Sequence, residues 1–421
     1  MRLKSVDRRI QVCEYECMGQ TSIPLESAVE RLLERTPVPN EHETVSLLDA
    51  LGRISYMNLK ALTDAPPFDN SPVDGFAVCH TDLSEASADS PAVLRVAETL
   101  YAGDGPIGSL VPGTCVRVMT GAPIPPGATC VVRYEDTDNG KAYVKIPVSL
   151  KKHQNYRFQG EDIRKDHGIL CKGESITPAH IGVLAGQGYT DAPVFKRPRV
   201  GVLSTGSELM SGNQPLKPGK IYDSNRYMLG AKVRTSGGEP VFCPNVADDP
   251  ETIAEALTAL LKLCDFAVTT GGVSVGDRDY MPLVGKILEA EPVFRGVQMK
   301  PGGWITAFRL DSKLILCLSG NPGAASINFD LLARPVIRRL AGCLQVLPRR
   351  IRCVLQKPFP KASESRRFLY ARLEDGGVIP SSTGFVSGSL GAVIGCNGIL
   401  DIPAGTPPLS AGDEADVILA D

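Results

Sequence analysis

The chain has 421 residues, of which 43% are hydrophobic and 22% are charged. At about 150 residues per domain, this length predicts about three domains. The 45 Lys and Arg residues nearly balance 47 Asp and Glu residues, which argues against a non-specific nucleic-acid binder. No apolar run reaches the ~20 residues of a membrane span, and residues 1–20 lack the apolar stretch of a secretory signal. We therefore expect a cytoplasmic protein that binds neither nucleic acid nor membrane, with a flexible tail at residues 1–20.

The first two hundred residues predict a helical domain interrupted by short strands. Apolar residues recur at helical spacing over 24–35, which predicts an amphipathic helix, and a second short helix is predicted over 46–53. A third helix should begin near Thr177, where Thr-Pro supplies the N-cap and the first helical residue. We expect the segment 155–188 to pack against the first helix. The predicted strands between these helices are broken by Gly and Pro, and they span residues 76–79, 92–100, 114–121, 128–136 and 142–148.

This pattern predicts a discontinuous N-terminal domain over residues 21–65 plus 156–197, with a small β-rich domain inserted over residues 66–155. From Arg199 strands and helices alternate, which predicts a doubly wound, mostly parallel sheet over residues 198–345. A hairpin-like excursion interrupts this pattern near residues 292–310. Short strands return after Arg350 and predict a separate β domain over residues 346–421. The fold class is therefore multidomain α/β plus β.

Three glycine-bearing turns follow strands of the predicted parallel sheet: "LSTGSEL", "TTGGVSVGDRD" and "LSGNPGAAS". Ligands of such sheets bind beyond the carboxyl ends of the strands, and free N–H groups of glycine turns suit an oxyanion. One such turn would more often be a simple strand-to-helix connection, but three on one edge favour a phosphate or oxyanion site. The candidate binding residues are Ser204, Thr205, Gly206, Gly271, Gly272, Ser274, Gly276, Ser319, Gly320, Asn321 and Pro322.

Carboxylates accompany these turns, notably Glu208, Asp248, Asp277 and Asp279. Acids near helix starts are ordinary N-caps, and Asp249 before Pro250 fits that role. Asp248 is then spare. Carboxylates beside an anion site are compatible if a divalent cation lies between them, and Mg²⁺ takes one or two carboxylates together with waters and phosphate oxygens.

Nine motifs in a fixed order add a more specific signal. They are "DNSPVDGFAV", "RVMTGAPIPPGA", "GEDIRK", "LSTGSEL", "IYDSN", "VADDP", "TTGGVSVGDRDYM", "MKPG" and "LSGNPGAAS". Together they resemble the molybdopterin molybdenumtransferase family, which includes MoeA of bacteria and the gephyrin E domain of animals. The resemblance extends from about Pro24 to the C-terminus. Local chemistry alone would treat the first three motifs as turns or charged loops.

The resemblance implies an elongated homodimer with a MogA-like molybdopterin-binding domain over residues 198–345 and a β-barrel-like C-terminal domain. It implies an enzyme that inserts molybdate into adenylated molybdopterin, with Mg²⁺-dependent hydrolysis of the adenylate and release of AMP. Its implied partners are a MogA-like adenylyltransferase and molybdoenzyme apoproteins. The implied functional residues are Asp74, Thr120, Glu208, Asp248, Asp279 and Lys300, with Glu208, Asp248 and Asp279 as metal ligands. Asp74 and Thr120 would reach across the dimer interface into the partner's site.

The chain departs from the family pattern around Lys300. Where the family commonly has Lys-Pro-Gly-Lys-Pro, this chain has "KPGGW", and Gly296 stands where the family has a further lysine. Arg295 offers a replacement cation, although guanidinium and ammonium groups differ in geometry. The missing lysines leave three alternatives to a standard molybdate enzyme: a tungstate-preferring enzyme, a retuned paralogue, or a molybdopterin-binding scaffold without turnover.

Overall fold

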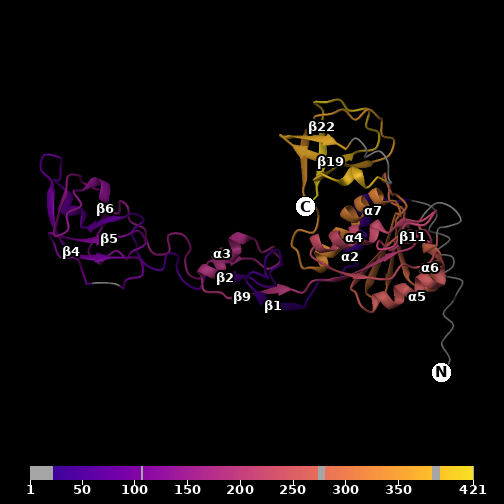
Figure 1. Cartoon of the computed structure of the whole chain (residues 1–421), viewed down its shortest axis with the longest axis horizontal. Coiled ribbons are helices and arrows are strands. Elements are labelled where there is room, and N and C mark those ends of the chain that lie inside the picture. Colours follow the sequence, from indigo (N-terminus) through magenta and orange to yellow (C-terminus); the bar gives the residue numbers. More distant parts are fainter. Residues whose placement is uncertain (1–21, 106–107, 274–279, 382–388, 421) are drawn as a thin grey trace, which may run out of the picture.

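The computed structural model describes residues 22–105, 108–273, 280–381 and 389–420. These residues form an elongated molecule with a small β-sheet at one end, a narrow connector in the middle, and an α/β domain with a β-barrel at the other end (Figure 1). None of the helices within these ranges combines the length and the apolar character that a membrane span requires.

The α/β domain is built on a six-stranded sheet with the order β13-β10-β14-β17-β16-β15. The first four strands are parallel, and β16 and β15 continue the sheet as an antiparallel edge. The strand bounds are β10 (Arg199–Ser204), β13 (Glu239–Phe242), β14 (Phe266–Thr270), β15 (Glu291–Arg295), β16 (Thr306–Leu310) and β17 (Lys313–Leu318). Every residue of β14 is buried, as expected for a parallel strand covered on both faces. The doubly wound prediction and its hairpin excursion are thus confirmed.

Helices cover both faces of this sheet. Alternate residues of β14 and β17 belong to two apolar cores, one shared with α4, α7 and α8 and the other with α5 and α6. The bounds are α4 (Ser224–Thr235), α5 (Pro250–Leu261), α6 (Met281–Ile287), α7 (Pro322–Asn328) and α8 (Arg334–Leu340), with a π-helical turn, η3 (Phe329–Ala333), between the last two. Asp249 caps α5, since its Oδ2 accepts a hydrogen bond from Thr252 N at 2.9 Å. This capping role agrees with the sequence prediction.

The connector joins two segments that are far apart in the sequence. Strand β1 (His42–Ser46) pairs with β9 (Asp191–Phe195), and β2 (Leu59–Lys60) pairs with β8 (Gly168–Leu170). The helix expected near Thr177 is present as α3 (Pro178–Gly186), and Thr177 Oγ1 accepts a hydrogen bond from His180 N.

Two predictions for the N-terminal segment are wrong. The helix expected over 46–53 is absent, because Ser46 ends β1 and residues 47–52 form turns. The first helix, α2 (Leu25–Glu34), exists, but it packs on α8, η3 and β15 of the α/β domain rather than against the segment 155–188. Its buried residues Leu25, Ala28 and Leu32 belong to the same apolar core as β10 and β14.

The sheet at the far end of the molecule, which we call the distal sheet, has the strand order β6-β3-β5-β4-β7. Its bounds are β3 (Gly75–Val78), β4 (Ala92–Leu100), β5 (Thr114–Val118), β6 (Cys130–Arg133) and β7 (Tyr143–Ile146), with 3₁₀ turns η1 (His80–Leu83) and η2 (Tyr134–Asp136). It has its own apolar cores on either face.

The C-terminal strands close into a barrel with the order β18-β20-β19-β21-β22. Their bounds are β18 (Arg350–Leu355), β19 (Arg367–Glu374), β20 (Gly377–Pro380), β21 (Gly398–Ile402) and β22 (Glu414–Leu419), with a 3₁₀ turn, η4 (Gly391–Val393). Buried charges tie the barrel to the α/β domain, because Asp330 of η3 accepts hydrogen bonds from Lys232 Nζ at 2.7 Å and from Tyr370 Oη at 3.0 Å. The predicted fold class, multidomain α/β plus β with a discontinuous N-terminal domain and a barrel-like C-terminal domain, is confirmed.

Candidate functional site

Three strand ends of the α/β domain open into one pocket. Strands β10, β14 and β17 are parallel neighbours, so the loops that follow them meet at the same sheet edge. The pocket has a volume of about 380 Å³. The predicted residues that line it are Ser204, Thr205, Gly206, Glu208, Asp248, Gly271, Gly272, Ser319, Gly320, Asn321 and Pro322. The short strands β11 (Leu209–Met210) and β12 (Ile221–Tyr222) form its rim.

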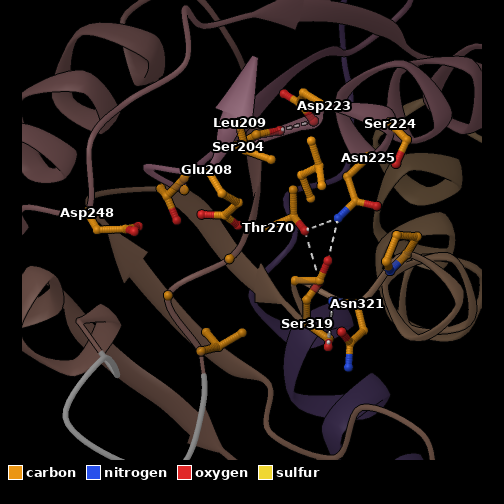
Figure 2. A pocket seen from close by; sticks show the side chains of 18 of the residues that line it. Ser204, Glu208, Leu209, Asp223, Ser224, Asn225, Asp248, Thr270, Ser319 and Asn321 are labelled. Atoms are coloured by element: carbon orange, nitrogen blue, oxygen red, sulfur yellow. Dashed lines mark hydrogen bonds between the residues drawn. The ribbon is translucent and has the colours of Figure 1, made fainter. Parts of the chain in front are cut away.

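A chain of hydrogen bonds holds two of these loops together (Figure 2). Asn225 Nδ2, at the start of α4, donates to Thr270 Oγ1 at 2.9 Å and to Gly320 O at 2.8 Å. Thr270 Oγ1 in turn donates to Ser319 O at 2.9 Å. The loops after β14 and β17 are therefore fixed relative to each other and to α4.

Gly271 is the tightest point of the pocket. It has φ +98°, a conformation that L side chains rarely adopt. A Cβ built on it would lie 2.3 Å from Thr205 O and 2.6 Å from Thr205 Oγ1. On the other side, a Cβ on Gly320 would lie 3.4 Å from Gly271 Cα. Only glycine at position 271 lets the loop after β14 approach the Thr205 loop this closely.

Two carboxylates line the pocket opposite the start of α4 (Figure 2). Asp248 Oδ2 accepts a hydrogen bond from Ser207 N at 3.1 Å, and its other oxygen has no protein partner among the hydrogen bonds of the described chain. Glu208 is exposed and lies against Gly206. Asp248 is thus free of helix capping, as its neighbour Asp249 takes that role.

Two of the three predicted metal ligands, Glu208 and Asp248, lie within the described residues. Among the residues that the structure describes, no group of three or more His, Cys, Asp or Glu side chains could hold a metal ion by itself. Glu208 and Asp248 supply two carboxylates, a set that suits Mg²⁺ when waters and substrate phosphates complete its shell. The predicted residues Asp279, Ser274 and Gly276, as well as Asp277, lie outside the described residues.

Lys300 does not line this pocket. It lies in a second pocket of about 780 Å³ between the α/β domain and the barrel, which Trp304, Arg350 and Arg366 also line. Lys300 is exposed, and its ammonium group forms no ion pair with any residue in the described part of the chain. Arg366, in contrast, donates twice to Asp401 and once to Glu26. These hydrogen bonds, above all those to Asp401, raise the pKa of Arg366.

Asp74 immediately precedes β3, and Thr120 lies two residues after β5. Both therefore adjoin the distal sheet, which lies at the opposite end of the molecule from β11 (Figure 1). The two residues contact each other, because Thr120 N and Thr120 Oγ1 donate to Asp74 Oδ1 at 2.7 and 2.8 Å. The backbone hydrogen bond, followed by the hydroxyl hydrogen bond, lowers the pKa of the Asp74 carboxyl. Within one chain, these two residues do not join the pocket.

Two pocket residues have roles that the sequence analysis did not assign, although it singled out their motif, "IYDSN". Asp223 and Asn225 line the pocket and are 6% and 8% exposed. Asp223 caps α4, since its Oδ1 accepts from Arg226 N at 3.0 Å. An Asp one residue before a helical Ser-Asn suggests a cap, and nothing in that pattern distinguishes a cap that also faces a ligand.

The fold and the pocket define a multidomain protein with a doubly wound α/β domain and a strand-end pocket. The family described as a probable molybdopterin binding domain matches residues 201–339, between matches to the MoeA N-terminal region (domain I and II) over residues 23–188 and the MoeA C-terminal region (domain IV) over residues 352–420. The chain belongs to the MoeA family.

Curated relatives and solved structures support this membership over almost the whole chain. The molybdopterin molybdenumtransferase of Bacillus subtilis (strain 168) is 35% identical over 409 residues, which cover 95% of this chain and 94% of the relative. That of Staphylococcus aureus (strain COL) is 35% identical over 403 residues, with 95% and 96% covered. The crystal structure of the molybdopterin biosynthesis MoeA protein from Pyrococcus horikoshii OT3 matches with a TM-score of 0.83 at 27% identity, covering 95% of this chain and all of that one.

Proposed function

We propose that this protein is a molybdopterin molybdenumtransferase, which inserts molybdate into adenylated molybdopterin. Water cleaves the phosphoanhydride bond of the adenylate, and AMP leaves. The two dithiolene thiols form two Mo–S bonds, and one oxo group of molybdate departs as water with both thiol protons. The reaction needs no oxidant or reductant. The proposal is supported by curated relatives of this name at 35% identity over 95% of the chain.

One observation carries the proposal: three strand-end loops, rich in glycine and small polar residues that suit a phosphate group, converge on a single pocket. The loops after β10, β14 and β17 line the same volume of about 380 Å³, and the loop after β17 leads directly into α7. Exposed backbone N–H groups and small side chains at such an edge suit a pyrophosphate. The substrate's phosphoanhydride would bind here, within reach of the carboxylates of Glu208 and Asp248.

These carboxylates would repel the substrate's phosphates without a cation between them. We therefore assign a Mg²⁺ site to Asp248 and Glu208, with Asp279 as the third predicted ligand. When bound, Mg²⁺ neutralises phosphate charge and stabilises the departing AMP. Asp248 holds its position through Ser207 N, so the ligand would be oriented before the metal binds.

Lys300 would bind the molybdate oxyanion through its ammonium group. This group is exposed in the second pocket and forms no ion pair with any described residue. The family lysines missing at Gly296 and Gly303 cannot be restored by simple substitution. A Cβ at Gly303 would lie 2.7 Å from Met299 O and 2.8 Å from Val297 O, and one at Gly296, where φ is +83°, would lie 2.7 Å from Ser22 Oγ. The loop around Lys300 therefore has no space for a side chain at position 296 or 303. This close packing favours the alternative of a retuned enzyme over that of a standard enzyme that has only lost two lysine side chains.

Asp74 and Thr120 would complete the site from the partner chain of a homodimer, because they are remote from the pocket of their own chain. Mixed dimers test this arrangement. Asp74→Asn and Glu208→Gln chains, each inactive alone, should regain about half of the wild-type activity per heterodimer, or about a quarter in a randomly paired 1:1 mixture, since one of the two shared sites of a heterodimer has both residues intact. Activity that remains absent in the mixture would contradict a shared site.

The direct test is AMP release from adenylated molybdopterin, with Mg²⁺ and with either molybdate or tungstate. An enzyme of the proposed kind releases AMP only when the oxyanion is present. Faster release with tungstate would identify the tungstate-preferring alternative. Tight binding of the substrate by a folded protein without AMP release at any oxyanion concentration would reject the enzyme and leave the scaffold alternative.

A further inference from the structure

The strand-end pocket has an apolar rim beside its glycine loops. The rim consists of Leu209 of β11 and of Ile221 and Tyr222 of β12, which all line the pocket. Ile221 and Tyr222 are 55% and 43% exposed, so a ligand can contact them as they stand. Exposed apolar side chains that gather at a pocket mark a binding surface. A phosphate group gains nothing from such a surface, so another part of the ligand must account for it.

The apolar rim is held in place by the protein itself. Leu209 pairs with Ile221 in the parallel register of β11 and β12, so these two side chains lie on one face of the short ribbon. Ile221 N donates a hydrogen bond to Glu208 O at 2.9 Å, and the Tyr222 hydroxyl donates to Gln214 O at 2.8 Å. Because these groups are already fixed, a ligand that packs on them orders few side chains when it binds.

The order of the strands places the apolar rim and Lys300 at opposite ends of one sheet edge. β15 is antiparallel to β16 and β16 is antiparallel to β17, so β15 ends at the same edge as the parallel strands β10, β14 and β17. From β10 onward, the order along this edge is β10, β14, β17, β16 and β15. Neighbouring strands lie about 4.8 Å apart, so four spacings, or about 19 Å, separate β10 from β15. The apolar rim follows β10, and Lys300 follows β15.

The proposed substrate has a matching polarity. Its phosphates join an adenosine to a molybdopterin, and the two thiols of the molybdopterin must meet the oxyanion at Lys300. The glycine loops lie between the two ends of the edge, and Thr270 of β14 lies between Leu209 and Ser319 in the close view (Figure 2). With the phosphates on these loops, the molybdopterin half points toward β15 and the adenosine half points toward β10.

We propose that the apolar rim of Leu209, Ile221 and Tyr222 binds the adenine ring of the substrate. This inference rests on the proposed function, which makes an adenylate the substrate. Adenine is a flat ring, and its faces pack well against aliphatic and aromatic side chains. Adenine bound at the rim orients the substrate along the sheet edge and directs its dithiolene end toward Lys300.

AMP and ribose 5-phosphate isolate the contribution of the ring, because they share the ribose and the phosphate and differ in the adenine. In the presence of Mg²⁺, the wild-type protein should bind AMP at least about 10-fold more tightly than ribose 5-phosphate. Equilibrium dialysis measures both dissociation constants. Equal affinities of the two probes would overturn the proposal without any variant.

The variant Ile221→Ala should remove part of this preference. It shortens an apolar side chain of the rim and leaves the backbone hydrogen bond to Glu208 O in place. AMP should bind about 5-fold more weakly, whereas the affinity for ribose 5-phosphate should not change. A folded variant with an unchanged ratio of the two affinities would overturn the proposal.

Leu216→Ala is the matched control. Leu216 lies in the connection between β11 and β12 and is 51% exposed, but it is not among the described lining residues. This variant should keep the wild-type ratio of the two affinities. An equal loss of AMP affinity in both variants would mean a general effect on the connection and would overturn the proposal.

A third probe, 6-hydroxymethylpterin, tests the opposite orientation of the substrate. A pterin bound at the rim would bind Ile221→Ala more weakly while AMP bound it as tightly as the wild type, and this result would overturn the proposal. AMP release from adenylated molybdopterin distinguishes the two levels of inference. Adenine preference at the rim without AMP release supports the rim contact and rejects the enzyme, whereas normal AMP release with equal affinities for AMP and ribose 5-phosphate rejects the rim contact alone.

Discussion

Gly271→Ala is the substitution that tests the pocket's architecture most severely. Gly271 has φ +98°, which costs an L residue about 1–2 kcal/mol. In addition, the new Cβ would lie 2.3 Å from Thr205 O, a backbone atom that moves only with its whole loop. Overpacking of this kind costs about 1–3 kcal/mol, so the local loss should be roughly 2–5 kcal/mol.

Function should fall with local stability, because Gly271 lies between two other loops of the pocket. The new Cβ meets Thr205, so the two loops that carry these residues must move apart. Gly320 lies on the other side, where a Cβ built on Gly320 would be 3.4 Å from Gly271 Cα. Misplacement of binding groups by about 1 Å can cost about 100-fold in rate. We expect the affinity for adenylated molybdopterin to fall by at least about 10-fold, measured by calorimetric titration.

Gly405→Ala provides the control for the backbone cost alone. Gly405 has φ +79° in the barrel, and a Cβ there would meet nothing within 4 Å. This variant should lose about 1–2 kcal/mol of local stability in the barrel and keep its substrate affinity. Hydrogen exchange of the amides of β14 and β21 measures the two local losses. Equal losses in both variants, with unchanged affinity in Gly271→Ala, would refute the reasoning.

Two further predictions concern charges away from the pocket. Asp330→Ala should lower the free energy of unfolding by about 3–5 kcal/mol, because it leaves the buried cations Lys232 and Arg334, each 2.7 Å from Asp330, without a counter-charge; a loss below about 1 kcal/mol in urea denaturation would contradict this. Thr120→Val should raise the pKa of Asp74, because the hydroxyl donor that helps to lower it is lost. The stabilisation from Asp74 is present above its unfolded pKa of about 3.9 and is lost as the pH falls through the lower folded pKa. An NMR titration measures the pKa of Asp74 in both proteins, and an unchanged pKa in Thr120→Val would contradict this prediction.

The sheet and its pocket were predictable because local signals and topology agree. The run Phe266–Thr270 has three apolar residues followed by two β-branched threonines and no charge, a composition that favours a parallel strand buried on both faces. Parallel strands place their carboxyl ends on one edge, so the loops near Ser204, Gly271 and Ser319 had to meet if the strands were neighbours. Capping of α3 by Thr177 and of α5 by Asp249 followed from Thr-Pro and Asp-Pro at helix starts.

The two wrong predictions for the N-terminal segment concern tertiary packing, because an apolar helix face in the sequence does not reveal which core it packs against. Helix α2 has a clear apolar face, but that face fits any core, and only the folded chain shows that it packs on α8. The segment 46–53, where a second helix was predicted, forms turns instead, and Leu48 and Leu51 are 81% and 51% exposed. Ser46 is the last residue of β1 and pairs with Asp191 of β9. The predicted first residue of the helix is therefore part of a strand.

Two features of the candidate site could not be read from local patterns. Asp223 and Asn225 look like an ordinary helix cap, and their unused oxygens become visible only when all their contacts are known. Lys300 follows β15, the outermost strand, which is separated from the parallel strands by β16. The chain after β15 runs to the barrel, where the backbone of Lys300 pairs with that of Arg367. The sequence resemblance named it as functional without placing it in the second pocket.

The central claim is that the loops after β10, β14 and β17 bind the substrate's phosphates. A crystal structure of the complex with adenylated molybdopterin tests it most directly. The account predicts the phosphoanhydride within hydrogen-bond distance of the loops at Gly271 and Gly320. Substrate bound only in the pocket beside Lys300, with the strand-end pocket vacant, would contradict it.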